Sequence, residues 1–292
     1  MRNIFILFLF LIAQLACIDE VDLSSNNLIR VIVVEGYLSD NLEKQIVKLT
    51  RSVSADSQIE VLVSGASLFI ERSDGVKLPY VEESEGIYSL ETSAVPGFEY
   101  RLIGTLADGR TVESDFQAIP AQVPVDSVNV IDTLVEFIDE SGDRRSIRVL
   151  DFYAGSNLDA LNNNAYLRYS SSTVFQISEI VCSPFVTPKT CYVYDDIPPL
   201  GIQLFQINPS NSPISFESLV YRRRIDFEFG ELFALDLSLL SYNESDFKYW
   251  ERIEDLFSQD GSLTDVRPSR LFGNIETNDG SEVQGQFSVV SK

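Results

Sequence analysis

Carboxylates are the most abundant groups in this sequence that could do chemistry, whereas imidazoles are entirely absent. The chain of 292 residues has 44 Asp and Glu, 22 Lys and Arg, a formal net charge of −22 and no His. A Ser-His-Asp triad and a His-ligated zinc site both need an imidazole, so the sequence excludes these two kinds of active site. A carboxylate pair could still act as general acid and base, but the sequence singles out no pair. The same negative charge repels phosphate backbones, and we expect no nucleic-acid partner.

Two acidic segments carry the oxygen ligands that Ca²⁺ prefers. Asp139, Glu140 and Asp143 lie around a glycine, and Asp195-Asp196 forms a second acidic pair. Neither segment has the ligand spacing of an EF-hand loop, so the sequence favours solvated turns at both places. We therefore predict no metal site, no other cofactor and no catalytic residue.

The amino terminus has the features of an export signal. Arg2 supplies a positive charge, and the apolar run from Ile4 to Ala13 is interrupted by Gln14, well short of the about 20 residues that a membrane-spanning helix needs. The stretch Gln14-Leu15-Ala16-Cys17 resembles a bacterial lipobox, in which the cysteine is diacylated and becomes the mature N-terminus. We predict a signal peptide over residues 1–16 and lipidation of Cys17. The alternative is an ordinary secretory signal followed by an incidental cysteine.

Residues 17–27 are predicted to form a lipidated polar tether between the anchor and the fold. The tether begins with the acidic stretch Ile18-Asp19-Glu20-Val21-Asp22. An acidic patch at this place is similar to the surface-export signal of Bacteroidetes lipoproteins, although it could also be a solvated tether. The expected location is the outer membrane, with the protein lipid-anchored and displayed at the cell surface.

The other two cysteines, Cys182 and Cys191, form an even pair in a chain that is expected to be exported. Such a pair favours a disulfide over two free thiols. Two cysteines without any histidine lack the ligands for a zinc site.

Three aromatic residues near Cys191 are candidates for contact with a ligand. Tyr192, Tyr194 and Phe205 flank the cysteine loop, and exposed aromatic side chains supply large contact areas at low entropic cost. Burial in the core is the alternative, and the sequence favours it.

The elements before residue 120 predict a β-sandwich domain, immunoglobulin-like or transthyretin-like, over residues 28–120. Turn residues at Asp74-Gly75, Glu85-Gly86 and Asp108-Gly109 separate short β-branched or alternating runs. The expected strands are Leu28–Leu38, Gln45–Arg51, Ser67–Arg72, Val76–Val81, Ile87–Leu90, Phe98–Leu106 and Arg110–Phe116. Pro120 and Pro124 then break the pattern, because proline cannot donate to a strand ladder.

Residues 125–292 are predicted to form a second β-rich domain that carries one long helix near residues 244–258. Phe247, Trp250 and Phe257 recur at helical spacing, which predicts an apolar stripe. Because Trp250 and Phe257 are seven residues apart, we expect both to anchor the helix on the β core of this domain. The predicted fold class is therefore mostly β.

Several short motifs along the chain resemble a known family when they are taken in order. They are the lipobox cysteine, Val33-Val34-Glu35-Gly36-Tyr37-Leu38, Tyr249-Trp250, Gly261-Ser262-Leu263, Pro268, Gly273-Asn274-Ile275 and Val283-Gln284-Gly285-Gln286-Phe287-Ser288. This series is similar to the domain-of-unknown-function family numbered 4249, a set of Bacteroidetes lipoproteins. The resemblance covers nearly the whole mature chain.

The resemblance implies a role but no catalytic residues. Members of this family are commonly encoded near TonB-dependent outer-membrane receptors, which implies a non-catalytic binding or accessory partner of such a transporter in nutrient uptake. One alternative is a surface hydrolase, which would be marked by two carboxyl groups about 5 to 10 Å apart in a deep cleft. Another alternative is an adhesin, which would be marked by an exposed apolar patch remote from the membrane.

Overall fold

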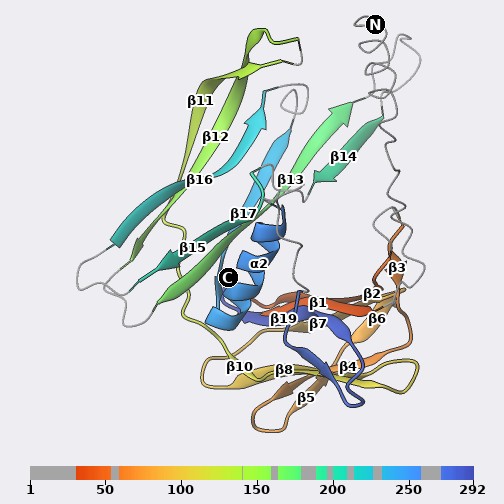
Figure 1. Ribbon diagram of the computed structural model, residues 1–292. Coiled ribbons are helices and arrows are strands. Elements are labelled where there is room, and N and C mark those ends of the chain that lie inside the picture. Colours follow the sequence, from red (N-terminus) through yellow and green to blue (C-terminus); the bar gives the residue numbers. More distant parts are fainter. Residues whose placement is uncertain are drawn as a thin grey trace, which may run out of the picture.

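The computed structural model describes residues 31–53, 59–139, 141–158, 164–178, 189–195, 200–208, 214–225, 232–257 and 271–292. Within these ranges the chain is mostly β and has one helix, α2 (Glu244–Phe257), so the predicted fold class is confirmed. Figure 1 shows two β-rich parts, with α2 between them.

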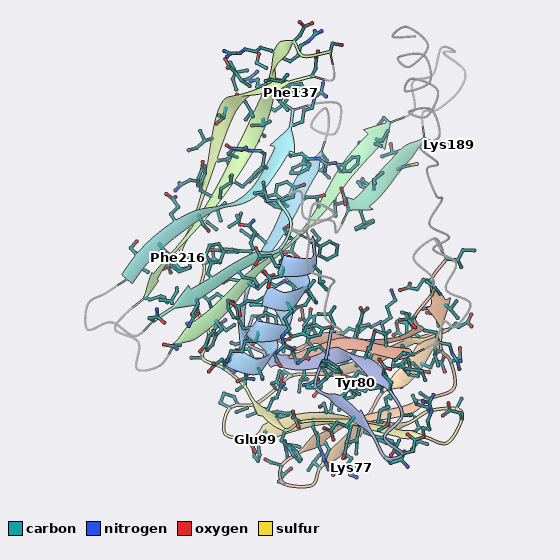
Figure 2. The ribbon with its side chains drawn as sticks, in the orientation of Figure 1. Lys77, Tyr80, Glu99, Phe137, Lys189 and Phe216 are labelled. Carbon is teal, nitrogen blue, oxygen red and sulfur yellow. The ribbon has the colours of Figure 1, made fainter. Side chains whose placement is uncertain are left out.

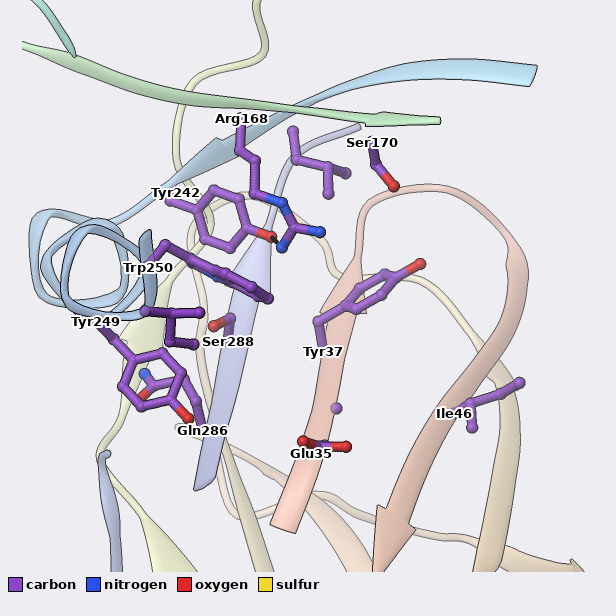
Figure 3. A pocket seen from close by; sticks show the side chains of 13 residues that line it. Glu35, Tyr37, Ile46, Arg168, Ser170, Tyr242, Tyr249, Trp250, Gln286 and Ser288 are labelled. Atoms are coloured by element: carbon purple, nitrogen blue, oxygen red, sulfur yellow. Dashed lines mark hydrogen bonds between the residues drawn. The ribbon is translucent and has the colours of Figure 1, made fainter. Parts of the chain in front are cut away.

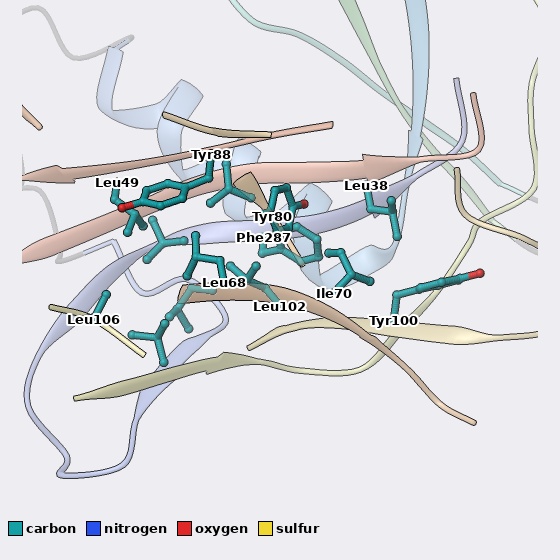
Figure 4. Packing of buried hydrophobic residues seen from close by; sticks show 14 of the residues in the cluster. Leu38, Leu49, Leu68, Ile70, Tyr80, Tyr88, Tyr100, Leu102, Leu106 and Phe287 are labelled. Atoms are coloured by element: carbon teal, nitrogen blue, oxygen red, sulfur yellow. The ribbon is translucent and has the colours of Figure 1, made fainter. Parts of the chain in front are cut away.

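The first part is a sandwich of two six-stranded sheets. The first sheet contains β1 (Ile32–Ser39), β2 (Glu43–Arg51), β3 (Val61–Leu62), β6 (Val81–Ser84), β7 (Ile87–Thr92) and β19 (Val283–Val290), and the second contains β4 (Ser67–Arg72), β5 (Lys77–Pro79), β8 (Glu99–Thr105), β9 (Thr111–Ser114), β10 (Gln117–Ala118) and β18 (Ile275–Thr277). Leu38 and Leu49 of the first sheet share one core with Leu68 and Leu102 of the second, and Phe287 lies in the same core (Figure 4). The sandwich prediction is confirmed.

The hairpin turns of the sandwich lie where the sequence predicts them. Gly75 and Gly109 have φ angles of 89° and 87°, a conformation that glycine adopts without steric penalty. One predicted strand is divided: the segment Val76–Val81 becomes β5 and β6, which lie in different sheets of the sandwich. Alternation alone could not locate this crossing, because both halves remain extended.

The last strand returns to the beginning of the chain. β19 pairs in parallel with β1, from Ile32 opposite Val283 to Ser39 opposite Val290, and β18 pairs with β9. The sequence predicts one C-terminal domain over residues 125–292, whereas residues 275–290 complete the sandwich. The reason is that parallel pairing joins distant segments and leaves no turn signal in the sequence.

The second part consists of a third and a fourth sheet. The third sheet contains β11 (Ser127–Ile138), β12 (Arg144–Leu158) and β16 (Ile214–Arg224), and the fourth contains β13 (Ala165–Ser178), β14 (Thr190–Asp195), β15 (Gln203–Ile207) and β17 (Phe233–Tyr242). Their shared core includes Ala154 and Tyr221 from the third sheet and Leu167 and Leu239 from the fourth.

The helix α2 packs at the junction through its first half. Phe247 is 3% exposed and lies in a cluster with Leu240 of β17 and Val290 of β19, against which Trp250 is partly buried. Phe257 is 82% exposed, so the prediction that it anchors the helix is wrong. Spacing by seven residues places two side chains on one helix face, but the last turn of α2 extends beyond the surface on which the first turns pack.

Candidate functional site

A groove of about 410 Å³ lies where α2 meets the sandwich and the fourth sheet. Its walls come from five strands and the helix (Figure 3). The lining residues are Glu35, Gly36, Tyr37, Ile46, Arg168, Ser170, Leu240, Tyr242, Tyr249, Trp250, Ile253, Gln286 and Ser288. Junctions between domains are a frequent place for small-molecule sites, so this groove is the candidate functional site.

Strand alternation explains how the sandwich presents polar side chains to the groove. On β1, Val34 and Leu38 are fully buried in the sandwich core, whereas Glu35 and Tyr37 point the other way and line the groove. β19 follows the same rule, because Phe287 lies in the core and its neighbours in sequence line the groove. The period of two along a strand therefore builds a polar and aromatic wall on the outer face of the first sheet.

The opposite wall is built by the fourth sheet. Leu167 and Tyr169 of β13 face the core of the second part, and the alternate residues Arg168 and Ser170 face the groove. The Cζ atom of Arg168 lies 3.7 Å from the centroid of the Trp250 ring. Its Nη1 donates a hydrogen bond of 3.3 Å to the hydroxyl of Tyr242, which Figure 3 draws as a dashed line. The guanidinium is thus held by two uncharged groups.

A buried carboxyl group lies at the start of α2, beneath the groove. The Oδ1 atom of Asp246 accepts hydrogen bonds from Nε2 of Gln117 at 2.8 Å and from Nε2 of Gln286 at 2.6 Å. Burial raises the pKa of Asp246 to about 6. Gln117 also accepts a hydrogen bond of 2.7 Å from the backbone N–H of Val289. This network connects the helix to both sheets of the sandwich, and through Gln286 it supports the floor of the groove.

The aromatic residues singled out in the sequence do not form one site. Tyr192 and Tyr194 are 55% and 74% exposed on β14, opposite Gln176 and Val174 of β13. They therefore share the face of the fourth sheet that carries Arg168, beyond the groove itself. Phe205 lies opposite Leu167 on the core face and contacts Tyr169 edge-on at 5.5 Å between ring centroids. The register of β15 separates it from the two tyrosines.

The three cysteines fall largely outside the described residues. Cys17 and Cys182 both lie there, and Cys191 is exposed on β14, opposite Ile177 of β13. The predicted disulfide would connect β14 to the segment that joins it to β13. It stays a prediction, which peptide mapping under non-reducing conditions tests directly.

In the acidic turn at residue 139, the carboxylate of Asp139 binds neighbouring groups of the same hairpin. Asp139 accepts hydrogen bonds from the backbone N–H groups of Ser141 and Asp143 at 3.0 and 2.9 Å, and it pairs with Arg145 at 2.9 Å. These interactions lower the pKa of Asp139. Among the residues that the structure describes, no group of three potential metal ligands occurs.

A second exposed feature is β11, which forms an edge of the third sheet. Apolar side chains on both of its faces are between 42% and 70% exposed, and Figure 2 shows Phe137 near the tip of the β11–β12 hairpin. The exposed apolar residues of β11 are Val128, Val130, Ile131, Leu134, Phe137 and Ile138. An exposed strand edge with such side chains is a ready place for pairing with another chain.

The sequence does not mark Arg168 and Tyr242 as site residues, because nothing in the local pattern distinguishes them from other strand residues. Glu35, Tyr37 and Trp250 belong to the family motifs, but these motifs are scattered along the chain. No signal in the sequence shows that these motifs converge, because the convergence depends on how the sheets pack.

Comparison with known proteins identifies the family. Residues 18–292 match the model of the family described as Domain of unknown function (DUF4249), so the chain belongs to this family, as the order of its motifs predicts. No curated protein matches the chain. In the part of the chain that the structure describes, no helix is long and apolar enough to cross a membrane.

Proposed function

We propose that this DUF4249 protein is a non-catalytic binding protein, lipid-anchored through Cys17 at the outer membrane, displayed at the cell surface, and accessory to a TonB-dependent transporter in nutrient uptake. The groove beside α2 carries the proposal. Three of the motifs that define the family resemblance meet there, contributing Glu35, Gly36, Tyr37, Tyr249, Trp250, Gln286 and Ser288. A family motif set that gathers around one groove at a junction supports a binding role.

The chemistry of the groove supports binding rather than hydrolysis. A carboxylate-pair hydrolase needs two carboxyl groups about 5 to 10 Å apart that both reach the substrate. Among the described residues that line the groove, Glu35 is the one carboxylate. Asp246 is buried beneath the groove with its Oδ1 atom held by two glutamine side chains. The remaining lining groups are aromatic rings, hydroxyls, an amide and one guanidinium, which suit recognition.

The edge of β11 supports a protein partner. An extended segment of another protein could add to this edge through main-chain hydrogen bonds, with specificity from alternate side chains. Asp132 and Glu136 lie on the same face of β11 as the exposed Leu134. Asp132 already pairs with Arg148, whereas Glu136 makes no ion pair among the described residues, so a strand with apolar side chains and a basic one near Glu136 fits this edge. We assign this strand to the transporter. The same apolar surface is also the observation that favours an adhesin as the second candidate.

The test is co-purification of the full chain from gently solubilised outer membranes of its native host. Wild-type protein should bring down one barrel protein, and Leu134→Lys/Ile138→Lys should lose it, because charges on an apolar edge oppose strand addition. Leu42→Lys/Val81→Lys is the matched control, since these side chains are 83% and 65% exposed on the sandwich. Cys17→Ser should move the protein from the membrane fraction to the soluble fraction.

Recovery of wild-type protein without a barrel protein in several mild detergents would count against the transporter role. If the β11 variant then also abolished attachment of cells to a surface, the adhesin would take its place. Retention of Cys17→Ser in the membrane fraction would contradict the anchor.

A further inference from the structure

Arg168 is a cation that has no carboxylate partner within the described part of this strongly acidic protein. The chain has a net charge of −22, yet no ion pair with Arg168 occurs among the described residues. Its contacts are the face of Trp250 and the hydroxyl of Tyr242. Burial raises the pKa of Tyr242 to about 12, so this hydroxyl stays neutral at physiological pH. No carboxylate of the described ranges therefore pairs with the positive charge of Arg168 in the groove.

The orientation of Arg168 leaves hydrogen-bond donors free for a ligand. A guanidinium has five N–H donors in one plane, and Tyr242 takes only one of them. Because Trp250 covers a face of the group, the unused donors at its edge remain available, and Figure 3 shows the guanidinium beside the Tyr242 hydroxyl, on the side toward Tyr37. The planar arrangement of these donors matches the two oxygens of a carboxylate.

The rest of the groove limits the charge of the ligand. Glu35 lies at the end of the groove away from Arg168 in Figure 3. The pKa of Tyr249 is raised mainly by burial of its hydroxyl and, to a smaller extent, by the negative charge of Glu35. The nearest basic side chain in the adjoining cavity, Lys292, already pairs with Glu43 at 3.2 Å. The groove offers one available cation, Arg168, and one carboxylate, Glu35, and the adjoining cavity adds the carboxylate of Asp236. Such surroundings suit a monoanion at Arg168, whereas a phosphate dianion would lack a second cationic partner.

The aromatic rings and hydroxyls that line the groove indicate what the rest of the ligand, apart from its carboxylate, should contain. Tyr37 from β1 and Trp250 from α2 offer ring surfaces on two sides of a space of about 410 Å³. A cavity of about 190 Å³ adjoins it, shares Tyr37 and Ser170, and adds the hydroxyls of Ser172 and Ser238. Rings pack well on aromatic surfaces, and hydroxyls on the ligand would find partners among the serines.

We propose that the groove binds a small ring-bearing monocarboxylate, whose carboxylate is held by Arg168 and whose ring lies between Trp250 and Tyr37. This inference rests on the proposed binding function and gives the chemical class of its ligand.

Calorimetric titration of the full chain with two acids and their amides tests the assignment. The probes are glucuronate against glucuronamide, for a hydroxylated ring, and phenylacetate against phenylacetamide, for an apolar ring. At least one acid should bind about ten-fold or more tightly than its amide, because only the acid makes a charge-assisted pair with the guanidinium. Arg168→Gln should remove that preference, and Tyr37→Ala should weaken acid and amide alike.

Arg144→Gln is the matched control, since Arg144 is exposed on β12 and lies outside the groove. A thermal melt of each variant separates loss of binding from loss of folding, and Arg168→Lys adds a folded variant that keeps the charge but lacks the planar fork. Equal binding of acid and amide by wild-type protein, binding of neither acid, or an unchanged preference in Arg168→Gln overturns the proposal. If the acids fail while the barrel protein still co-purifies, the ligand class is wrong and the accessory role stands.

Discussion

Among single residues, Asp246 is the buried charge on which the junction depends. Desolvation raises the pKa of its carboxyl from 3.8 to about 6, although two glutamines donate hydrogen bonds to it. Because the pKa is higher in the folded state than in the unfolded chain, the protonated group favours folding. This contribution is fully present below pH 3.8 and is lost as the pH rises through about 6. It amounts to about 3 kcal/mol at most.

We predict that Asp246→Asn removes this pH dependence. The amide keeps an oxygen that can accept both hydrogen bonds, and it never ionises. Relative to wild type, the variant should therefore gain about 2 to 3 kcal/mol of unfolding free energy between pH 4 and pH 7. Urea denaturation at both pH values measures the difference. Glu254→Gln, on the exposed face of α2, is the control and should show no such gain. An equal gain in both variants would place the effect outside the buried site.

At the scale of elements, α2 shows what helical spacing can and cannot predict. The 3.6-residue recurrence of aromatic side chains located the helix within a residue or so of its observed ends. It could not say which of those side chains is buried, because burial depends on the strands that the helix meets. Phe247 meets Leu240 and Val290, whereas Phe257 meets solvent.

We predict unequal costs for truncating these two phenylalanines. Phe247→Ala should lower the unfolding free energy by about 3 to 5 kcal/mol, because it empties a packed site at the junction. Phe257→Ala should change it by about 0.5 kcal/mol or less, as expected for an exposed side chain. Equilibrium denaturation in urea compares the two variants. Similar losses from both would mean that the last turn of α2 packs against the rest of the protein.

The pairing register of the strands shows the same limit of local sequence patterns. Local Asp-Gly pairs correctly located the hairpins at Gly75 and Gly109, and the alternation of side chains along β14 places Tyr192 and Tyr194 on one face. Whether Phe205 joins the two tyrosines depends instead on pairing between β13 and β15, which no nearby residue specifies. The sequence therefore predicts faces within a strand but not which faces of separate strands coincide.

At the scale of the whole molecule, the groove and the sandwich both depend on the return of β19. This strand lies against β1, which precedes it by some 250 residues of sequence, and its outer face forms part of the groove. The motifs on β1, α2 and β19 were visible in the sequence, but their meeting point follows only from this parallel pairing. Domain boundaries drawn from local composition could not include it.

Gly285 is the position where this long-range pairing is most constrained. It has a φ of +103°, and a Cβ atom there would lie 2.0 Å from the backbone oxygen of Val34. Gly280 also has a positive φ, +69°, but a Cβ atom there would meet nothing within 4 Å. Comparing alanine substitutions at the two glycines therefore separates two free-energy costs. One is the cost of a positive φ in a residue other than glycine, and the other is the cost of displacing β1.

We predict that Gly285→Ala lowers the unfolding free energy by about 3 to 4 kcal/mol, against about 1 kcal/mol for Gly280→Ala. Because Val290 of β19 also packs with Phe247, the loss should reach the junction as well as the sandwich. Trp250, the single tryptophan of the chain, lies at that junction and reports its unfolding by fluorescence, while far-ultraviolet circular dichroism reports the sheets. The midpoints of both unfolding curves should shift to the same lower urea concentration in Gly285→Ala. A shift in circular dichroism with unchanged Trp250 fluorescence would show that the junction is stable without β19 in place, and that the two parts of the molecule unfold independently.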